Sequence, residues 1–266
     1  MGVVLSKKKL TSFQIIIIGF SSVILLGTLL LMLPISSRTG EFTSFADALF
    51  TSTSTVCVTG LIVFDTATYW SLFGQFVIML LIEIGGMGVI TVAASFAMIA
   101  GRKISLMQRS TMQEAIAAPK VGGIVRLTIF VIKATLMIEL LGAVAMSPVF
   151  CRDFGIKGLW MALFHSVSAF CNAGFDLMGV KSPFSSLTFY ADEPLINFPI
   201  MLLIIIGGIG FLTWDDIRAN RFHIHKYRMQ SKVIISTTAI LILVPALYFY
   251  FFEFSDLGLK ERVLSS

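Results

Sequence analysis

The sequence has few charged side chains. Only 13% of its 266 residues are charged, whereas 56% are hydrophobic, and the mean hydropathy is +0.91. A soluble domain carries roughly a quarter charged residues, because these cover its surface. The shortage excludes an ordinary soluble domain and indicates that lipid is the main solvent of this chain.

Cysteine is also scarce. Cys57, Cys151 and Cys171 are odd in number and show no CxxC or zinc-ligand spacing, so we expect neither a disulfide framework nor a zinc site. A cleavable signal pattern is missing as well. The apolar run after the three N-terminal lysines has about 20 residues, and no small-residue cleavage site follows it. We interpret this run as a retained first membrane helix.

Groups that carry enzymatic chemistry are equally absent from the sequence pattern. No nucleophile stands beside a base, and no carboxylate pair has a spacing suited to acid–base chemistry. The sequence therefore predicts a protein that is not an enzyme and has no covalent cofactor.

Long apolar segments are what the chain has in abundance. Each is long enough to cross a bilayer, which indicates an all-α membrane protein. They lie at about 13–33, 70–100, 125–147, 195–213 and 232–252.

The basic and acidic residues are distributed unequally between the two expected sides of the membrane. The N-terminus and the loops near 101–126 and 215–232 hold 13 of the 20 Lys and Arg but only three of the 15 acidic residues. The positive-inside rule places the N-terminus and these basic loops in the cytoplasm of a multi-pass cell-membrane protein. Topology thus explains the net charge of +5. We expect membrane lipid as a partner, and no nucleic acid.

The second half of the chain repeats the first. A shift of 114 residues aligns "TSTSTVCVTG" at 51–60 with "HSVSAFCNAG" at 165–174. A shift of 122 aligns the helices that follow, "FVIMLLIEIGGMGVIT" and "FPIMLLIIIGGIGFLT". This register indicates an internal duplication. Two serines, a cysteine and a glycine coincide in the loops: Ser52, Ser54, Cys57 and Gly60 with Ser166, Ser168, Cys171 and Gly174.

Each repeat is predicted to be a helix–pore loop–helix unit. The apolar stretches at about 45–55 and 158–170 are too short to span a bilayer, which is typical of re-entrant half-helices. The backbone after each stretch has to line protein or a watery cavity. Carbonyl groups aimed into a pore replace the hydration shell of a cation, and a helix C-terminus adds negative potential. Gly60 and Gly174 either permit this backbone or serve only as C-caps.

These features resemble the Ktr/Trk/HKT superfamily of potassium transporters, most closely the membrane subunit of bacterial Ktr systems. The resemblance rests on the loops "TVCVTGL" and "AFCNAGF" and on the motifs "GGMG" and "GGIG". It implies potassium uptake through a selectivity filter of K⁺-binding carbonyls, with sodium as a possible activator. The implied filter residues are Val58, Thr59, Gly60, Asn172, Ala173 and Gly174.

The resemblance also implies partners and an arrangement. Membrane subunits of this family form homodimers on a cytoplasmic KtrA-like regulatory ring that binds ATP or ADP. The family fold has four units around one pore, whereas this sequence predicts two complete units and the start of a third. We expect a first unit at 1–100, a cytoplasmic linker at 101–124, a second unit at 125–214, a linker at 215–231 and an incomplete third unit at 232–266.

Several further residues have both a functional and a structural interpretation. Lys133 and Glu139 lie within an apolar segment on largely different helix faces, and we expect a structural anchor. Glu83 has Ile205 as its repeat partner, which favours a packing contact over a role shared by both units. His223 and His225 lie in a basic loop, where a solvated role is more common than metal binding. The GG motifs favour close helix packing over nucleotide binding.

Two alternatives to a transport subunit stay open. A non-conducting scaffold, or a truncated paralogue that binds full-length partners, would have the same loops, and coding sequence beyond Ser266 would favour the transport subunit. A solute carrier with discontinuous helices would need broken spanning helices, which the apolar pattern does not indicate.

Overall fold

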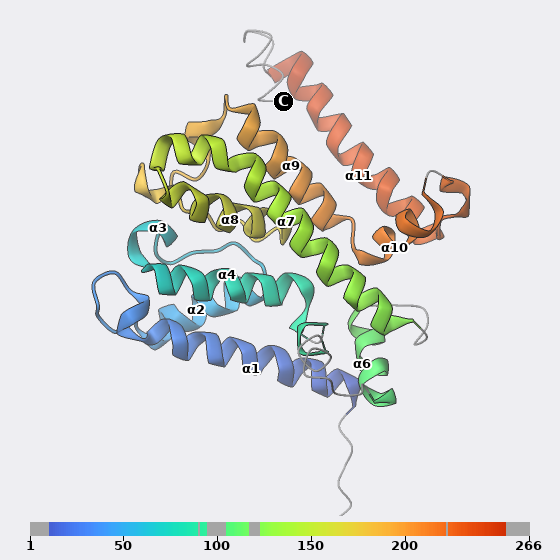
Figure 1. Ribbon diagram of the computed structural model, residues 1–266, viewed down its shortest axis with the longest axis horizontal. Coiled ribbons are helices and arrows are strands. Elements are labelled where there is room, and N and C mark those ends of the chain that lie inside the picture. The colour runs from blue at the N-terminus through green and yellow to red at the C-terminus, as the bar shows by residue number, and fades with distance from the viewer. Residues whose placement is uncertain (1–10, 90, 95–104, 117–122, 222, 254–266) are drawn as a thin grey trace, which may run out of the picture.

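The computed structural model describes residues 11–89, 91–94, 105–116, 123–221 and 223–253. In these ranges the secondary structure is helical, and the β pairing consists of one isolated bridge between Ser37 and Trp70. The expected all-α architecture is therefore confirmed. Figure 1 shows the helices of residues 12–87 lying beside those of residues 124–208.

The first half of the chain forms a long helix, a short helix, a loop and a second long helix. Serine and threonine side chains start three of these helices by accepting a hydrogen bond from the first turn, which satisfies otherwise unpaired N–H groups. Thr11 and Gln14 form a reciprocal capping box, and Ser44 and Ser71 cap the next two. The helices are α1 (Ser12–Met32), α2 (Phe45–Val56), α3 (Thr66–Tyr69) and α4 (Leu72–Met87).

The second half has the same order of helices. The first is longer here and packs against both helices that follow it. A connecting helix, α6 (Leu106–Ile116), precedes this half. The helices are α7 (Ile124–Phe154), α8 (Lys157–Phe170), α9 (Pro194–Gly208), α10 (Phe211–Asn220) and α11 (Met229–Tyr248), which ends in a π-helical turn (Phe249–Glu253).

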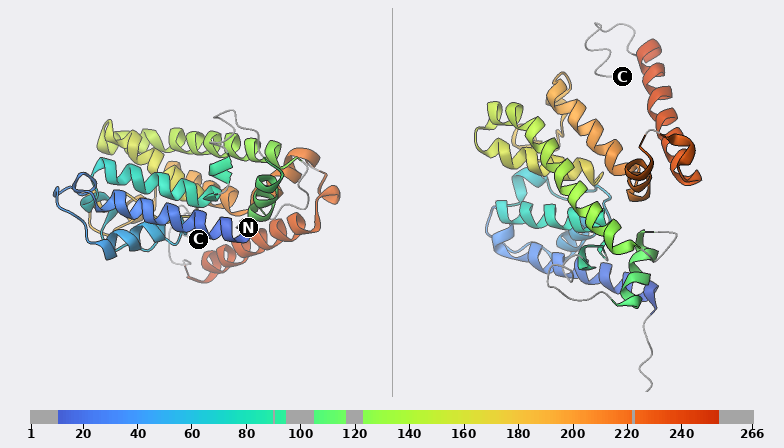
Figure 2. Two further views of the ribbon diagram at one scale, coloured as in Figure 1. Left: turned by 90° about the horizontal axis from the view of Figure 1, so that it is seen from below. Right: turned by 45° about the vertical axis from the view of Figure 1, so that its right-hand side comes forward.

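Three of the described helices are long and apolar enough to cross a membrane: α1, α7, and α11 with its π turn. The apolar side chains of α11 are exposed along its length, as expected of a helix that faces lipid or another chain. Figures 1 and 2 show α11 at the edge of the molecule.

Two spans that the sequence predicts as continuous are broken. In the span expected at 70–100, α4 ends at Met87 and Gly88 adopts φ 83°; Val89 and residues 91–94 are helical again, and residues 90 and 95–100 lie outside the described ranges. The span expected at 195–213 ends at Gly208, and α10 then departs at 93°. A broken helix, which the apolar pattern does not indicate, is therefore present. Glycines at matching repeat positions, Gly88 and Gly210, have positive φ at the two breaks.

The start of α11 is fixed to α10. Asp216 is buried, and its Oδ2 accepts hydrogen bonds from the backbone N–H of Arg228 at 3.0 Å and from Ser231 Oγ at 2.5 Å. The guanidinium of Arg228 also pairs with Asp215 at 2.9 Å. The region expected as the linker 215–231 thus contains a helix and a polar junction.

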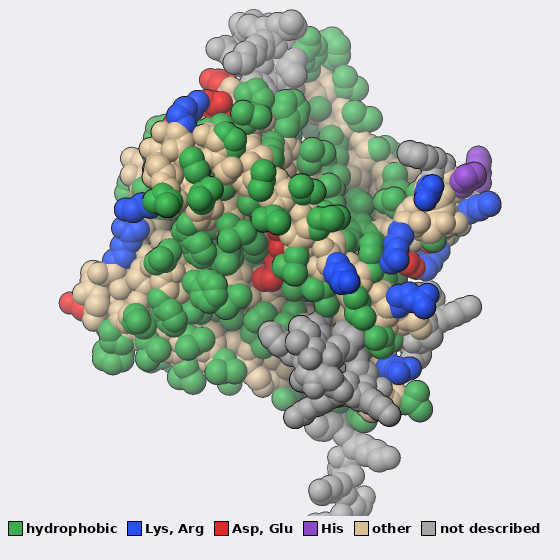
Figure 3. Space-filling view, viewed as in Figure 1, with side chains coloured by type: hydrophobic (Ala, Val, Ile, Leu, Met, Phe, Trp, Pro, Cys, Tyr) green, Lys and Arg blue, Asp and Glu red, His purple; other side chains and the backbone are tan. Residues whose placement is uncertain are grey.

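Basic side chains gather at one end of the molecule. Figure 3 shows Lys, Arg and His along one edge, where Figure 1 shows α6 and α10. Exposed members of this group include Arg109, Arg218, Arg221 and Lys226. His223 and His225 are exposed in the same region.

Candidate functional site

Each glycine-bearing loop begins at the end of a short helix. Helices α2 and α8 coincide with the stretches expected at 45–55 and 158–170. Cys57 and Cys171 are the C-caps, with nearly identical backbone angles. The negative ends of both helix dipoles therefore point to the start of a loop, which favours a cation there.

The two loops follow the same backbone path. Val58 and Asn172 have φ values of 55° and 57°, and two residues later Gly60 and Gly174 have φ values of 76° and 73°. Left-handed backbone is rare for residues with a side chain, so its recurrence at matching positions shows that both loops are held in a specific conformation.

Matching serines hold the two loops. Ser54 accepts a hydrogen bond through its carbonyl oxygen from the N–H of Thr59 at 2.9 Å, and its hydroxyl donates to the carbonyl of Leu61 at 2.6 Å. In the second loop, the carbonyl of Ser168 accepts from Ala173 at 2.8 Å, and its hydroxyl donates to Phe175 at 2.6 Å. Each serine thus bridges the loop and fixes the carbonyls between its two ends.

The carbonyl oxygens of the expected filter residues are left free. No hydrogen bond from the described part of the chain ends on the carbonyls of Val58, Thr59 or Gly60, or on those of Asn172, Ala173 and Gly174. Most backbone carbonyls in folded proteins are paired, so two consecutive runs of free ones are available to bind a cation.

The two glycines lie next to each other. A Cβ on Gly60 would lie 2.8 Å from the carbonyl oxygen of Ala173, and a Cβ on Gly174 would lie 3.6 Å from the Cα of Gly60. The structure therefore brings together two residues that the sequence places 114 positions apart. The first contact leaves no room for a side chain, whereas the second is an ordinary van der Waals distance.

The GG motifs pack closely on the ends of the short helices. A Cβ on Gly85 would overlap the carbonyl of Val56, and a Cβ on Gly207 would overlap that of Phe170. The close helix packing expected for these motifs is confirmed.

His165 supports the second loop, a role that the sequence pattern does not reveal. It is buried, its Nδ1 lies 2.7 Å from the carbonyl of Met161, and its Nε2 accepts the N–H of Leu177 at 3.2 Å. These partners assign a proton to Nδ1 and none to Nε2. Its repeat partner is Thr51, so no motif marked it.

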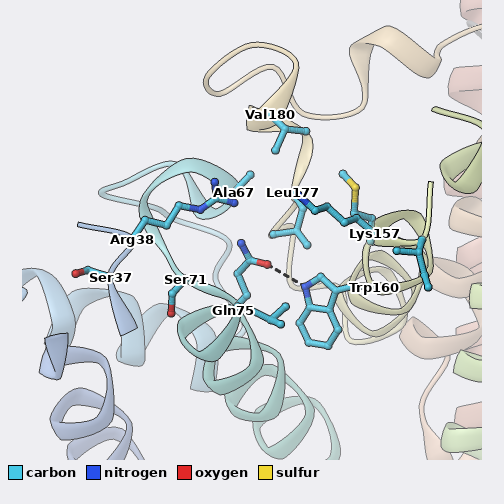
Figure 4. A pocket seen from close by; sticks show the side chains of 12 residues that line it. Ser37, Arg38, Ala67, Ser71, Gln75, Lys157, Trp160, Leu177 and Val180 are labelled. Atoms are coloured by element: carbon cyan, nitrogen blue, oxygen red, sulfur yellow. Dashed lines mark hydrogen bonds between the residues drawn. The ribbon is translucent and has the colours of Figure 1, made fainter. Parts of the chain in front are cut away.

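A hydrogen bond joins the two halves near one end of the short helices. Trp160 on α8 donates from Nε1 to Oε1 of Gln75 on α4 at 2.9 Å, and Gln75 donates to the carbonyl of Trp70 at 3.1 Å. Figure 4 shows this bond in a cavity of about 650 Å³ lined from both halves. Arg38 and Lys157 lie on opposite sides of this cavity.

Three residues that the sequence treats separately form one cluster. Ligand atoms of Glu83, Glu139 and Cys171 lie within 4.8 Å of one another. Glu139 is 3% exposed, whereas Lys133 on the same helix is exposed, and the structure records no ion pair between them. Glu83 makes the packing contact expected for it, because its side chain on α4 lies against Glu139 on α7 and Cys171 at the end of α8.

The comparison with known families gives the class of the protein. The sequence matches the family described as "TrkH: Cation transport protein" over residues 6–257. The chain therefore belongs to the TrkH cation transport family, a transport family and not an enzyme family. With its long apolar helices, it is a membrane protein.

Three curated relatives are similar to this chain over most of its length. The chain is 44% identical over 257 residues to "Potassium/sodium uptake protein NtpJ" of Enterococcus hirae, with 96% of this chain and 55% of that protein covered. It is 39% identical to "Ktr system potassium uptake protein B" of Bacillus subtilis, covering 94% and 55%, and 35% identical to the protein of that name from Vibrio alginolyticus, covering 90% and 52%. The chain thus spans about half the length of these curated relatives.

Proposed function

We propose that this chain is part of the membrane subunit of a potassium uptake system and that its two loops form part of the selectivity filter. The relatives named for potassium uptake in their Ktr systems support the substrate. In this proposal, the carbonyls of Val58, Thr59 and Gly60 line the ion path together with those of Asn172, Ala173 and Gly174.

The observation that carries the proposal is the pair of free carbonyl runs. Both follow the C-terminus of a short helix, both contain a glycine with φ near 75°, and both are braced by a serine hydroxyl. A cation that leaves water requires such oxygens in place of its hydration shell, and a fixed backbone distinguishes ions by their size and number of ligands.

The remaining parts of the proposal concern regulation and topology. We propose cytoplasmic placement of the basic end, in line with the positive-inside rule. A nucleotide-binding regulatory subunit docks there, the membrane subunit forms a homodimer, and sodium stimulates uptake. The naming of two relatives as parts of a Ktr system supports more than one component.

The experiment is a substitution at Gly60. Gly60→Ser is expected to raise sodium uptake relative to potassium uptake, because the new side chain would collide with the Ala173 carbonyl and displace it. Gly40→Ser is the matched control: Gly40 has φ 72° but nothing within 4 Å of a new Cβ. Uptake of both ions is measured in cells that lack their own potassium systems. Unchanged selectivity of the Gly60 variant at normal membrane expression would contradict the filter assignment.

A further inference from the structure

The cluster of Glu83, Glu139 and Cys171 lies at the boundary between the two halves. Glu83 belongs to α4, Glu139 to α7, and Cys171 caps the end of α8. The sequence spacing indicates no metal site, since Glu83 and Cys171 lie 88 residues apart. Folding nevertheless places one oxygen of each carboxyl group and the sulfur within 4.8 Å of one another.

The carboxyl groups of this cluster face each other and Cys171, whose thiol donates to Oε2 of Glu83 at 3.7 Å, and no basic side chain of the described residues pairs with them. Glu139 is only 3% exposed, and its Oε1 has no hydrogen-bond partner in the described structure. The Oε1 of Glu83 is also buried and without a partner. Neither residue takes part in a recorded ion pair among the described residues. Acidic side chains at membrane depth are costly unless a cation or another polar group faces them.

The distances suit a small tetrahedral cation. Around zinc, a sulfur at about 2.3 Å and an oxygen at about 2.0 Å lie roughly 3.5 Å apart. The Sγ of Cys171 and the Oε2 of Glu83 are 3.7 Å apart. Two oxygens bound to one zinc lie roughly 3.3 Å apart, so the remaining separations, at most 4.8 Å, would have to shorten by up to about 1.5 Å through rotation of the carboxyl groups.

The surroundings leave space for the sulfur. A Cβ on Gly86 would overlap Sγ of Cys171, so the absence of a side chain there permits the approach of α4. Glu83 is half-buried as a residue, although its Oε1 is enclosed.

We propose that Glu83, Glu139 and Cys171 bind a divalent cation of the zinc or cadmium class at the boundary between the two halves. Two carboxylates and one thiolate supply three ligands, and water completes a tetrahedron. The sulfur selects a borderline or soft ion over K⁺ and Mg²⁺, which prefer oxygen. The bound ion ties α4 to α7 and to the start of the second loop.

The other loop provides an internal control. Cys57 is the repeat partner of Cys171, but Ile205 corresponds to Glu83. Ser166 donates to the carbonyl of Glu139, and Ser52 donates likewise to Ile24, so Ile24 corresponds to Glu139. Cys57 therefore lacks both carboxylates and is exposed.

The test is a titration of the purified protein in detergent with cadmium. The ultraviolet charge-transfer band of the cadmium–thiolate bond reports binding. A Cys57→Ser, Cys151→Ser variant keeps Cys171 as the single thiol of residues 1–266 and is expected to bind one equivalent there. Adding Cys171→Ser to this variant is expected to abolish the band, and adding Glu139→Gln instead is expected to weaken binding by about tenfold or more.

A second measurement separates binding from misfolding. Zinc is expected to raise the thermal unfolding temperature of the single-thiol variant and of Cys57→Ser, but not of Cys171→Ser, because a ligand that binds only the folded state stabilises it. Comparable unfolding temperatures without metal show that the variants are folded. A band that persists without Cys171, or cadmium binding that does not change with Glu139→Gln, would overturn the proposal. So would the absence of both band and zinc stabilisation in the single-thiol variant.

Discussion

The indole N–H of Trp160 lies 2.9 Å from the side-chain oxygen of Gln75, and this bond links the second half of the chain to the first. Gln75 is 5% exposed, so its oxygen has no ready alternative in water. The same side chain donates to the carbonyl of Trp70, at the turn before α4. Gln75 therefore connects the turn at Trp70 with α8, the short helix that precedes the second loop.

Breaking this connection is expected to cost stability. Trp160→Phe keeps a ring but removes the donor, which leaves a buried oxygen unpaired and lowers the free energy of unfolding by about 1–2 kcal/mol. A double-mutant cycle with Gln75→Met isolates the contribution of the bond, for which we expect about 1 kcal/mol of coupling. Thermal unfolding in detergent measures both quantities. Additive effects of the two substitutions would show that the bond contributes nothing.

The two loop glycines are expected to tolerate a methyl group differently. Gly60→Ala adds backbone strain and a contact of 2.8 Å with the carbonyl of Ala173, whereas Gly174→Ala adds strain alone. Gly40→Ala, at φ 72° and in open space, measures the strain by itself, about 1–2 kcal/mol. Unfolding should give similar losses for Gly174 and Gly40 and a larger one for Gly60. Equal losses at Gly60 and Gly174 would mean that the loops do not meet as described.

The serine hydroxyls that brace the loops are expected to matter for ion preference. Ser168→Ala frees the carbonyl of Phe175, and Ser54→Ala frees that of Leu61, so each loop loses a 2.6 Å bond. We expect about 1–2 kcal/mol of lost stability and a weaker preference for potassium over sodium. Ser147→Ala is the control, since its exposed hydroxyl bonds only within α7. Uptake of both ions, normalised to membrane expression, measures the effect, and wild-type selectivity in both loop variants would refute it.

The basic end is expected to contribute to docking of a regulatory subunit. Arg109→Gln, Arg221→Gln and Lys226→Gln together remove three exposed charges, each worth up to about 0.5 kcal/mol in contact with an acidic partner. Binding of the regulatory ring should weaken by up to about tenfold at low salt and less at high salt. Pull-down at two salt concentrations measures it, and Lys157→Gln is the control at the other end. Loss of binding that is the same at both salt concentrations would argue against an electrostatic contact.

Hydropathy predicted much of the fold because membrane helices can be recognised from their apolar composition. The expected helix at 13–33 is α1, and the short helices at 45–55 and 158–170 are α2 and α8 within a few residues. The repeat also predicted that two loops share a conformation, which Gly60 and Gly174 bear out in their φ values. The assignment of their carbonyls to a potassium filter stays a prediction.

The features that sequence reasoning missed depend on backbone angles and on distant contacts. Gly88 and Gly210 interrupt runs whose composition stays apolar, and hydropathy carries no information about φ. The cluster at Glu83 and Cys171 was missed because spacing arguments compare residues near each other in the chain. The repeat partner of Glu83 is the apolar Ile205, and this mismatch was the available signal for a contact specific to the boundary between the halves.

The break after Gly208 has a mechanical consequence. The chain turns at Gly210, which adopts φ 79°, and Trp214 then holds α10 in place. Its Nε1 donates to the carbonyl of Ile206 on α9 at 2.9 Å, and its ring lies 5.6 Å from that of Phe170 at the end of α8. Asp216 joins α10 to the start of α11, so a force applied to the basic end would reach α9 and the end of α8 through these contacts. The turn lies two residues beyond α9, whose Gly207 packs on the carbonyl of Phe170 at the start of the second loop.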